Sequence, residues 1–342
     1  MGDIKVVDNV LQDNLKRFKG ELETLILGCD KTVIVPHNRA DYDAIGSALG
    51  LTMISKKFKK PSYVLVDDPI YSMEIGLRQI LDEAKDMAQV INKEKYLSIK
   101  GVKDLVILTD VSNSKLISIP DELPKDVAVI DHHDPTPYLV TGKCNLVDSS
   151  VSSASEIVTR LLKLYKIKIP ANLANYLLAG IYLDTNHFDK ISKSTTSVMT
   201  DLLEAGASMG TVRNWFIESF ESHRRITEVV NNVKFYTLRF AVASGNPEIE
   251  YTREELAKIA DSLLKFGADA SFAIGETGSN NISISARSNG PVNVGMIVNE
   301  LDGGGNPRAA AVPKIEGQTL DEVEKSLIKV IRPKYYIKEE TN

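Results

Sequence analysis

The sequence predicts an α/β protein: an N-terminal domain with a parallel sheet and flanking helices, a helical connector, and a smaller α/β domain. Three observations lead to this prediction. Short apolar runs alternate with amphipathic stretches through the first half, which is typical of strands separated by crossover helices. The pattern is then almost entirely helical from about residue 152 to 235, and strands resume after it. A chain of 342 residues also exceeds the size at which single hydrophobic cores usually stop growing.

Four apolar runs in the first half are predicted strands. They are TVIVPH at 32–37, SYVLVDD at 62–68, DLVILTD at 104–110 and DVAVIDHH at 126–133. Helices are predicted around them, over residues 8–27, 43–58 and 70–90. Strands that alternate with helices in this order predict a parallel sheet.

The second half begins with helices. These are SASEIVTRLLKLY, NLANYLLAGIYLDT, TTSVMTDLLEAG with Gly206 as a C-cap, and a long helix through HRRITEVVNNVKFY. Next come a strand RFAVAS, a helix TREELAKIADSLLKF, strands SFAIGET and NISISARS, a helix at 291–300, a Gly-rich turn and a final helix LDEVEKSLIKVI. We place the boundary near residue 235, which gives domains over residues 1–220 and 237–342 with a connector helix at 221–236.

Composition excludes several classes of protein. A formal net charge of -5 argues against a partner such as long nucleic acid, because proteins that coat it usually carry a basic excess. No run approaches the roughly 18 to 20 apolar residues that a membrane helix needs, and the N-terminus lacks the order of a signal peptide. Cys29 and Cys144 have no metal-ligand spacing, which predicts free thiols in a reducing compartment. We therefore expect a cytoplasmic protein.

Several apolar runs share one property, which is that they end in Asp or His. In an open parallel sheet the carboxyl ends of the strands deliver such residues to one edge, where ligands bind. The helical run LLAGIYLDT contributes one more acid at its end. The predicted metal ligands are His37, Asp41, Asp43, Asp110, His132 and Asp184, with Asp131 and His133 beside them.

Carboxylate and imidazole ligands without thiolate suit a hard-to-borderline divalent cation, Mn²⁺ first, then Mg²⁺, Fe²⁺ or Co²⁺. Six side chains exceed what one open catalytic site needs. Two ions about 3.5 to 4 Å apart, bridged by one carboxylate, would use all six, activate a water and neutralise a phosphoryl oxygen. The pattern therefore predicts a two-metal hydrolase of phosphate esters.

Simpler interpretations exist for single residues. An Asp at a strand end is often a turn former or a helix N-cap, and Asp43 before AIGSALGL could be only that. The set is harder to explain in this way, because three of the five histidines fall within it. His187 lies close enough in sequence to Asp184 to reach the site, although a surface or helix-end role is the simpler interpretation. His223 is expected to be solvated.

A second constellation lies near the C-terminus, where SISARS is followed by GGGNPRAAA. Three consecutive glycines permit positive φ and close backbone approach, so their amides can hold a phosphate. Arg287 at a strand end is a natural bidentate partner for phosphate. A Gly-rich turn alone is more often only a tight turn. Beside an upstream metal cluster, it indicates a domain that grips a small nucleotide. The predicted substrate-binding residues are Arg287, Ser288, Gly303, Gly304, Gly305 and Asn306.

At these residues the sequence resembles a known family. H-x-x-x-D-x-D-A-I-G-S at 37–47, Asp110, D-H-H at 131–133 and Asp184 are similar to the ordered motifs of the DHH phosphoesterase superfamily, and the ARS and GGGN segments resemble its DHHA1 domain. The resemblance covers about residues 30 to 330. It implies that His37 and Asp41 hold one metal, that Asp43, His132 and Asp184 hold the other, and that Asp110 bridges them. It also implies that Asp131 orients the site, that His133 faces the substrate phosphate, and that the chain forms a homodimer through its metal-binding domain.

Further segments resemble the catalytic half of GdpP-type cyclic-di-AMP phosphodiesterases, among them LDTNHF, VRNWFIESFESHRRI and ISARSNGPVNVGMIVNELDGGGN. Such proteins usually carry membrane helices and sensory domains ahead of this half. Two positions depart from the family pattern: Ala40 replaces the usual Pro, and Asn306 replaces a His expected to contact substrate. Asparagine still donates a hydrogen bond but carries no positive charge, so we expect weaker phosphate binding or a shifted substrate preference.

Four functions compete on these grounds. The first is hydrolysis of cyclic di-AMP to linear pApA, with possible continuation to AMP. The second is a nanoRNA and pAp hydrolase, which has the same metal residues and a different substrate domain. An inorganic pyrophosphatase is disfavoured because its partner domain lacks the GGG turn. A cyclic-dinucleotide binder without turnover is disfavoured because all six predicted ligands are present.

Overall fold

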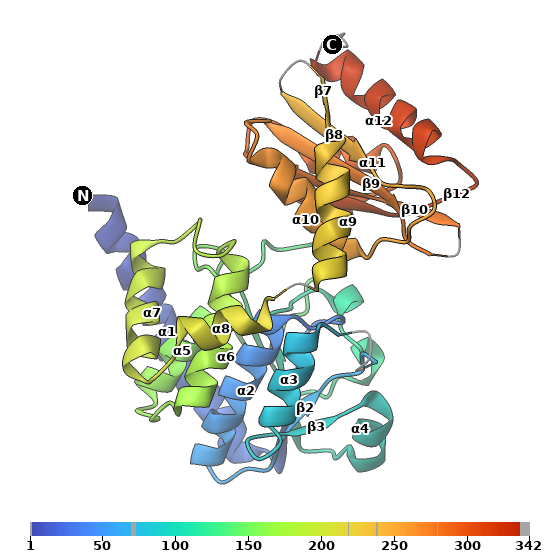
Figure 1. Cartoon of the computed structure of the whole chain (residues 1–342). Helices are drawn as coiled ribbons and strands as arrows, with labels where there is room; N and C mark the ends of the chain where they lie inside the picture. The colour runs from blue at the N-terminus through green and yellow to red at the C-terminus, as the bar shows by residue number, and fades with distance from the viewer. Residues whose placement is uncertain (1, 70–72, 218, 237–238, 279, 336–342) are drawn as a thin grey trace. The chain divides into compact units, whose positions relative to one another are not determined.

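The computed structural model describes residues 2–69, 73–217, 219–236, 239–278 and 280–335. The chain divides into two compact units, Met1–Ile217 and Glu218–Asn342. The predicted fold class is confirmed: the first unit holds a parallel sheet with flanking helices, and the second, smaller unit holds a mixed sheet with helices (Figure 1). Of the helices in these ranges, none combines the length and the apolar character that a membrane crossing requires.

The sheet of the first unit is parallel throughout, in the order β3-β2-β1-β4-β5-β6. Helices separate β1, β2, β3 and β4 along the chain, and long connections without an α-helix lead from β4 to β5 and from β5 to β6, so each new strand can lie parallel to its neighbour. The strands are β1 (Lys31–Val35), β2 (Ser62–Leu65), β3 (Gln89–Ile91), β4 (Asp104–Thr109), β5 (Val127–Asp131) and β6 (Cys144–Val147).

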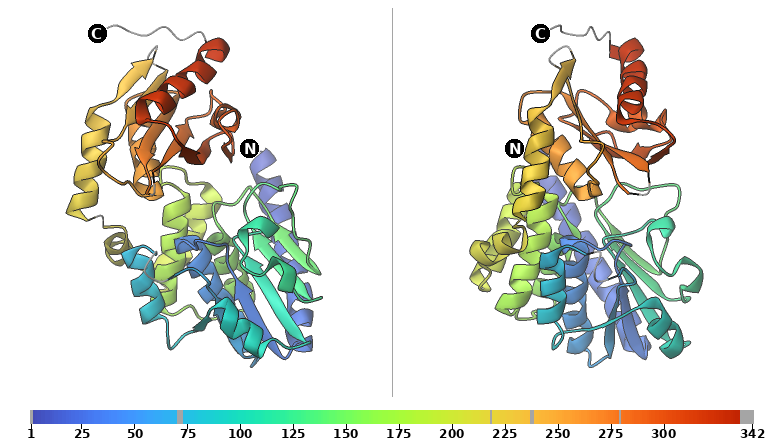
Figure 2. Two further views of the ribbon diagram at one scale, coloured as in Figure 1. Left: turned by 90° about the vertical axis from the view of Figure 1, so that its right-hand side faces the viewer. Right: turned by 45° about the vertical axis from the view of Figure 1, so that its right-hand side comes forward.

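Successive residues of the central strands enter two different cores. Ile34 and Ile107 pack against the larger core, whereas Val33 and Val106 face the other side. The larger core contains the apolar residues of α1, α2, α3, α5 and α6, and the smaller one contains Tyr96 of α4. Figure 2 shows this layering, with α4 on the side of the sheet opposite to α2 and α3. Strands buried on both faces explain the continuous apolar runs of the sequence.

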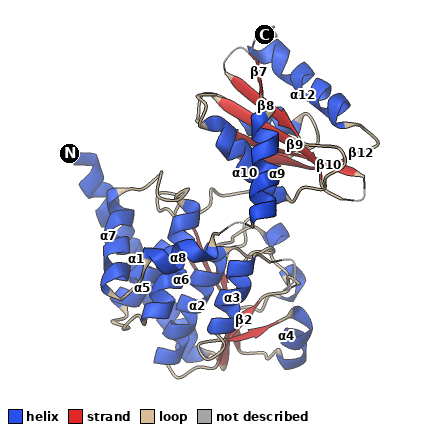
Figure 3. Ribbon diagram, in the orientation of Figure 1, coloured by secondary structure: helices blue, strands red, loops and turns tan. Residues whose placement is uncertain are grey.

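Helices make up most of the rest of this unit, as the blue ribbons of Figure 3 show. They are α1 (Gly2–Gly28), α2 (Tyr42–Lys57), α3 (Ile75–Glu83), α4 (Lys93–Ile99), α5 (Ala154–Leu164), α6 (Ala171–Asp184), α7 (Lys193–Glu204) and α8 (Met209–Trp215), with short 3-10 turns at Ser114–Leu116 and Pro120–Glu122. Gly206 has φ of +101° just after α7, in agreement with its predicted capping role.

The second unit contains a mixed sheet in the order β11-β12-β10-β9-β8-β7, in which only β8 and β9 pair in parallel. Apolar residues of α9 and α10 cover one face, and those of α11 and α12 cover the other. The elements are α9 (Phe220–Asn231), β7 (Lys234–Tyr236), β8 (Phe240–Ser244), α10 (Arg253–Leu264), β9 (Ala270–Glu276), β10 (Asn281–Ser288), α11 (Val294–Asn299), β11 (Gly304–Gly305), β12 (Ala309–Glu316) and α12 (Leu320–Tyr335).

Some local predictions were wrong. The helix predicted through HRRITEVVNNVKFY ends at Asn231, and Lys234–Tyr236 pairs with β8 instead, because its residues continue the sheet. The helix predicted over 70–90 is shorter, since α3 ends at Glu83 and β3 follows as the edge strand; residues 70–72 lie outside the described ranges. β6 and α4 had not been predicted at all. The helix expected as a connector corresponds to α9, which packs against α10 within the second unit.

Candidate metal centre

Three neighbouring strands carry candidate ligands to one edge of the first sheet. His37 follows β1, Asp110 follows β4 directly, and His132 follows β5. Since β1, β4 and β5 are adjacent and parallel, their carboxyl ends lie side by side at the same edge. Helices supply the other acids, Asp41 and Asp43 at the start of α2 and Asp184 as the last residue of α6.

The side chains predicted as metal ligands come together in this unit. Among the described residues, three groupings place imidazole nitrogens and carboxylate oxygens within 4.8 Å of one another, and all three lie in the first unit. They consist of His37 with Asp41 and Asp110, of Asp43 with His132 and Asp184, and of Asp110 with His132 and His133. Acidic and histidine residues in these groupings could therefore hold metal ions.

Asp110 faces two of the groupings with its two oxygens. Its Oδ2 lies 3.4 Å from Nε2 of His37, and its Oδ1 lies 3.2 Å from Nε2 of His132. The residue has φ of +57°, a conformation that Asp and Asn adopt more readily than most other residues. This turn immediately after β4 presents the carboxylate between the two histidines.

The two acids at the start of α2 have different neighbours. Asp41 caps the helix, because its Oδ1 accepts hydrogen bonds from the backbone N–H of Asp43 and Ala44 at 2.9 and 3.0 Å. Its Oδ2 lies 3.7 Å from His37 Nε2, so a capping role and a place in the cluster are compatible. Asp43 is not the cap. Its carboxylate accepts backbone hydrogen bonds from Ala154 at 2.6 Å and Ser155 at 2.8 Å in the first turn of α5.

Asp131 organises the two histidines that follow it. Its Oδ1 accepts hydrogen bonds from the backbone N–H of His132 and of His133, at 2.8 and 3.2 Å, and lies 2.8 Å from Nδ1 of the His133 ring. This contact with Asp131 raises the pKa of His133 above its ordinary value of 6.5. The side chain of His133 is 57% exposed, so the opposite side of its ring is open to a ligand.

The chemistry of this donor set fits divalent cations. Oδ1 of Asp110 and Oδ2 of Asp184 are buried and accept no hydrogen bond from the described residues, which is costly for a carboxylate unless a cation is near. Burial, followed by the charge of Asp110, raises the pKa of Asp43 to about 6. Burial and neighbouring carboxylates likewise raise the pKa of Asp184 well above its ordinary value. A bound cation would stabilise the charged form of both buried carboxylates and offset the repulsion that adds to each shift.

The residues predicted to bind substrate lie in the second unit. Arg287 and Ser288 end β10, and Gly304 and Gly305 form β11, whose partner is β12. Arg287 Nε lies 3.1 Å from Asp261 Oδ1, and its Nη1 donates to Ser285 Oγ at 3.3 Å. The side-chain oxygen of Asn306 accepts hydrogen bonds from the backbone N–H of Arg308 and Ala309, so this residue holds the Gly-rich turn in shape.

The two remaining histidines lie outside the metal groupings. His187 is exposed and stacks on the Tyr182 ring with centroids 4.6 Å apart, and it has φ of +60°. His223 lies in α9 and is exposed, as predicted. Neither residue joins His37, His132 or His133 in a grouping within the described ranges.

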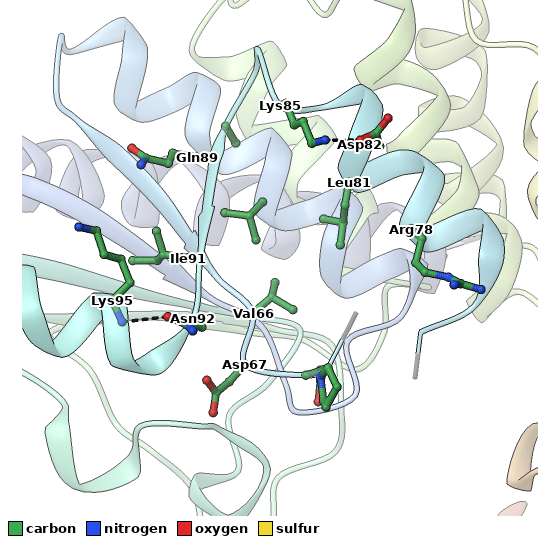
Figure 4. Close-up of a pocket in the computed structure, with 14 residues that line it drawn as sticks. Val66, Asp67, Arg78, Leu81, Asp82, Lys85, Gln89, Ile91, Asn92 and Lys95 are labelled. Carbon is green, nitrogen blue, oxygen red and sulfur yellow. Dashed lines mark hydrogen bonds and ion pairs between the residues drawn. The ribbon is translucent and has the colours of Figure 1, made fainter. Parts of the chain in front are cut away.

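A cavity of about 960 Å³ lies beside the edge strand β3, between α3 and α4 (Figure 4). Its lining mixes apolar side chains such as Leu81 and Ile91 with charges of both signs, including Arg78 and Asp67. None of the histidines or acids of the metal groupings lines it. The metal groupings, rather than this cavity, therefore define the candidate site.

Sequence reasoning missed the parts of the protein that support Asp43. The first turn of α5 donates to this carboxylate, and Gly180 of α6 makes room for it, since a Cβ there would meet Asp43 Oδ1 at 2.5 Å. A sequence signal existed for the first feature, because Ser153-x-x-Glu156 before an apolar run is the pattern of a capped helix N-terminus. Nothing in the sequence indicated what that helix end would bind.

Known proteins resemble this chain in both units. The family model of the DHH family, N-terminal domain, matches residues 31–181, and that of the DHHA1 domain matches residues 232–332. The cyclic-di-AMP phosphodiesterase GdpP of Geobacillus thermodenitrificans is 30% identical over 322 residues, which cover 91% of this chain and 48% of that protein. The bifunctional oligoribonuclease and PAP phosphatase NrnA of Thermus thermophilus is 25% identical and is matched over 87% of this chain and 88% of its own length.

A solved structure shares the fold. It belongs to an exopolyphosphatase-related protein from Bacteroides fragilis, with a TM-score of 0.78, 22% identity, and coverage of 92% of this chain and 96% of that one. The chain spans only 37% to 48% of the length of five of the curated relatives that it matches. The two family matches agree with the two units and with the acidic and histidine side chains at the edge of the first sheet. The chain therefore joins an N-terminal domain of the DHH family to a DHHA1 domain.

Proposed function

We propose that this chain is a phosphodiesterase that depends on two divalent cations and hydrolyses cyclic di-AMP to linear pApA, with possible continuation to AMP. The observation that carries the proposal is the position of Asp110, whose two oxygens face His37 on one side and His132 on the other. A carboxylate between two imidazoles suits a pair of cations that share one ligand. The similarity to GdpP supports the choice of substrate.

Each of the ligand residues has a proposed role. His37 and Asp41 would hold one cation, the group of Asp43, His132 and Asp184 would hold the other, and Asp110 would be a ligand shared by the two. When bound, the cations supply an activated water and neutralise charge on the phosphoryl group. We propose Mn²⁺ as the native ion, with Mg²⁺, Co²⁺ and Fe²⁺ as alternatives, because the donors are oxygen and imidazole nitrogen.

The remaining residues act on the substrate. His133, held at Nδ1 by Asp131, is positioned to donate a hydrogen bond from Nε2 to a phosphoryl oxygen. In the second unit, Arg287 and Ser288 with the turn Gly303 to Asn306 hold the nucleotide. Exposure of Gly304 and Gly305 supports this role, since their backbones are open to a ligand.

A nanoRNA and pAp hydrolase is the second candidate. NrnA of Thermus thermophilus is named for activities on oligoribonucleotides and PAP, and it matches this chain over 88% of its own length. Asn306 in place of the expected histidine also removes a positive charge from the proposed substrate site. A change of this kind alters which phosphate groups the site prefers.

One assay separates the candidates. The whole chain is incubated with Mn²⁺ and, in separate reactions, with cyclic di-AMP, pApA, short RNA, pAp and pyrophosphate, and the products are resolved by chromatography. Our proposal predicts that cyclic di-AMP is opened to pApA with the highest kcat/KM. Faster turnover of short RNA and pAp would favour the second candidate, and binding of cyclic di-AMP without any product would show a nucleotide binder instead.

The expected homodimer and the expected cytoplasmic location stay predictions. Both come from the sequence and its family resemblance. Light scattering of the purified chain tests the first, and fractionation of cells that express it tests the second.

A further inference from the structure

Glu156 is a buried glutamate of the first unit for which the proposed reaction has no direct use. Its side chain is fully shielded from solvent, in the first turn of α5. Oε1 accepts hydrogen bonds from Arg160 Nη2 at 2.8 Å and Ser194 Oγ at 3.0 Å. Oε2 accepts from Ser152 Oγ at 2.7 Å and from Thr195 Oγ1 at 2.9 Å. A buried charge is tolerated only with so complete a set of donors.

The neighbours of Glu156 in sequence hold a proposed metal ligand. Ala154 and Ser155 are the first two residues of α5, and their N–H groups donate to the two carboxylate oxygens of Asp43. Ser153 caps the helix by accepting from the N–H of Glu156 at 3.0 Å. Asp43 is therefore bound by a helix N-terminus, where backbone amides favour an anion. The place of this first turn determines where Asp43 lies.

Glu156 also connects this turn to a second helix. Ser194 and Thr195 belong to the first turn of α7, and Arg160 donates to the carbonyl oxygen of Ser194 at 3.0 Å as well. α7 packs against both α5 and α6, and α6 ends at Asp184. Glu156 thus joins the turn that holds Asp43 to the helix that follows Asp184. Both of these acids belong to one grouping, together with His132.

We propose that Glu156 is a positioning residue, which fixes Asp43 in the grouping with His132 and Asp184 through the first turn of α5. This inference rests on the proposed function, because it gives Glu156 a purpose only if the grouping binds a cation. In the proposed role, Glu156 does not bind Asp43 or His132 directly. It acts through the backbone of Ala154 and Ser155.

Replacement of Glu156 by glutamine should loosen this arrangement while preserving its size. The carboxylate accepts on both sides, whereas an amide has one accepting oxygen and one donating NH₂ group. The hydroxyls of Ser194 and Thr195 can reverse their roles. The Arg160 guanidinium at Oε1 and the Ser152 N–H, which lies 3.3 Å from Oε2, can only donate. Whichever way the amide is turned, one of these two donors faces another donor. The first turn of α5 then loses a fixed contact, and Asp43 loses its fixed position.

The second unit contains a matched control in Glu255. This residue is also buried near the start of a helix, where Arg225 Nε and Ser222 Oγ donate to its Oε1 at 3.0 and 2.7 Å, and the Thr252 N–H donates to its Oε2 at 2.9 Å. It lies in α10, and none of the three metal groupings is in its unit. Glu255→Gln therefore disturbs the same kind of network without a cation site beside it.

The test measures Mn²⁺ binding to three whole chains: the unaltered protein, Glu156→Gln and Glu255→Gln. Electron paramagnetic resonance of the free ion reports how much Mn²⁺ each protein has bound. Thermal unfolding in EDTA measures the stability of each protein without metal. We expect Glu156→Gln to weaken one class of Mn²⁺ site about 10-fold, at the low end of the effect of residues that support metal ligands. Glu255→Gln should bind Mn²⁺ as the unaltered chain does, even at an equal loss of unfolding temperature.

A kinetic measurement separates positioning from simple destabilisation. In Glu156→Gln, kcat for cyclic di-AMP should fall and the Mn²⁺ concentration for half-maximal activity should rise, while KM for the dinucleotide stays unchanged. If Glu156→Gln fails to fold, Thr195→Val removes one donor to Oε2 and should weaken Mn²⁺ binding about 5-fold, the equivalent of one net hydrogen bond.

The outcomes distinguish the two proposals. Equal Mn²⁺ affinity in the unaltered chain and in Glu156→Gln, or in Thr195→Val where that variant is used, overturns the positioning role alone. Equal weakening by Glu156→Gln and Glu255→Gln also overturns it, because the effect would then be general. Absence of Mn²⁺ binding by the unaltered chain overturns the proposed function and this inference together.

Discussion

The two sheets of this protein have similar numbers of strands but gather their candidate residues in different ways. In the first sheet every strand is parallel, so residues far apart in sequence, such as His37, Asp110 and His132, meet at one edge. In the second sheet most neighbours are antiparallel, so strand ends alternate between opposite edges, and the candidates lie instead on β10 and the turn at β11. The first arrangement produces a convergent charge cluster in which Asp43 and Asp110 are buried and the other ligands half-buried, and the second an exposed turn at Gly304 and Gly305. This difference is consistent with our proposal that the first unit carries the chemistry and the second binds the nucleotide.

The largest expected effect follows from Asp110→Asn. Asparagine tolerates the positive φ of this position, so the turn after β4 should keep its conformation while the bridging charge is lost. We expect kcat to fall by more than about 100-fold, the upper range for residues that only support ligands. The measurement is Mn²⁺-dependent hydrolysis of cyclic di-AMP.

Asp126→Asn is the matched control for that variant. Asp126 lies in the same unit and pairs with Lys143 at the surface, away from the metal groupings. Its replacement should leave kcat unchanged. Comparable activity in Asp110→Asn and Asp126→Asn would contradict the proposed bridging role of Asp110.

Gly180→Ala tests how closely the first unit is packed around its ligands. A Cβ at Gly180 would lie 2.5 Å from both Asp43 Oδ1 and Ser155 Oγ, so the helices must move apart or Asp43 must shift. We expect destabilisation of about 1–3 kcal/mol, typical of overpacking, together with weaker Mn²⁺ binding. Gly20→Ala in α1 has nothing within 4 Å and should instead stabilise the protein by up to about 1 kcal/mol. Similar unfolding temperatures for the two variants would contradict the predicted close packing.

Arg287→Gln tests the assignment of recognition to the second unit. Loss of charge-assisted hydrogen bonds to phosphate should raise KM for cyclic di-AMP about 10-fold, with kcat and Mn²⁺ affinity little changed. Arg239→Gln removes a more exposed arginine of the same unit, which pairs with Asp269, and should leave KM unchanged. A fall in kcat at constant KM in Arg287→Gln would show that Arg287 takes part in the hydrolysis step. It would contradict the proposal that the second unit serves only to bind the nucleotide.

The smallest expected effect concerns the pH dependence of the second unit. Burial raises the pKa of Glu324, but hydrogen bonds from Lys234, Ser244 and Tyr236 outweigh burial and hold the pKa below its ordinary value of 4.5. A depressed pKa stabilises the folded state above pH 4.5 and loses that contribution as the pH falls through the folded value. The protection of α12 amides against hydrogen exchange, taken relative to intrinsic exchange at each pH, should therefore fall below pH 4.5, and Glu324→Gln should reduce this dependence. If the pH dependence of α12 exchange is unchanged in Glu324→Gln, ionisable groups other than Glu324 cause it.

The sequence predicted the first sheet and its cluster well because topology alone brings those residues together. The strand ends at His37, Asp110 and His132 are visible in the sequence as the ends of apolar runs. Because the strands are parallel, these ends lie at the same edge of the sheet. Short edge elements such as β3 were not predicted, since three residues carry little periodicity.

The sequence carries weaker signals for tertiary contacts between side chains than for the ends of strands. The role of the α5 N-terminus toward Asp43 requires that residues 43 and 154 meet, which no local pattern encodes. The ion pair of Arg287 with Asp261 depends in the same way on the packing of α10 against β10. Side-chain partners of this kind are decided by how helices pack on the sheet, and propensity and spacing do not specify that packing.

We propose that the edge of the first sheet is a metal-dependent phosphodiesterase centre. Its most direct test is the hydrolysis of cyclic di-AMP by the whole chain after removal of metals with EDTA, before and after addition of Mn²⁺. We predict no product from the stripped protein and formation of pApA once Mn²⁺ is restored. Hydrolysis at the same rate without any divalent cation, or no hydrolysis of any phosphodiester with Mn²⁺ bound, would contradict the claim.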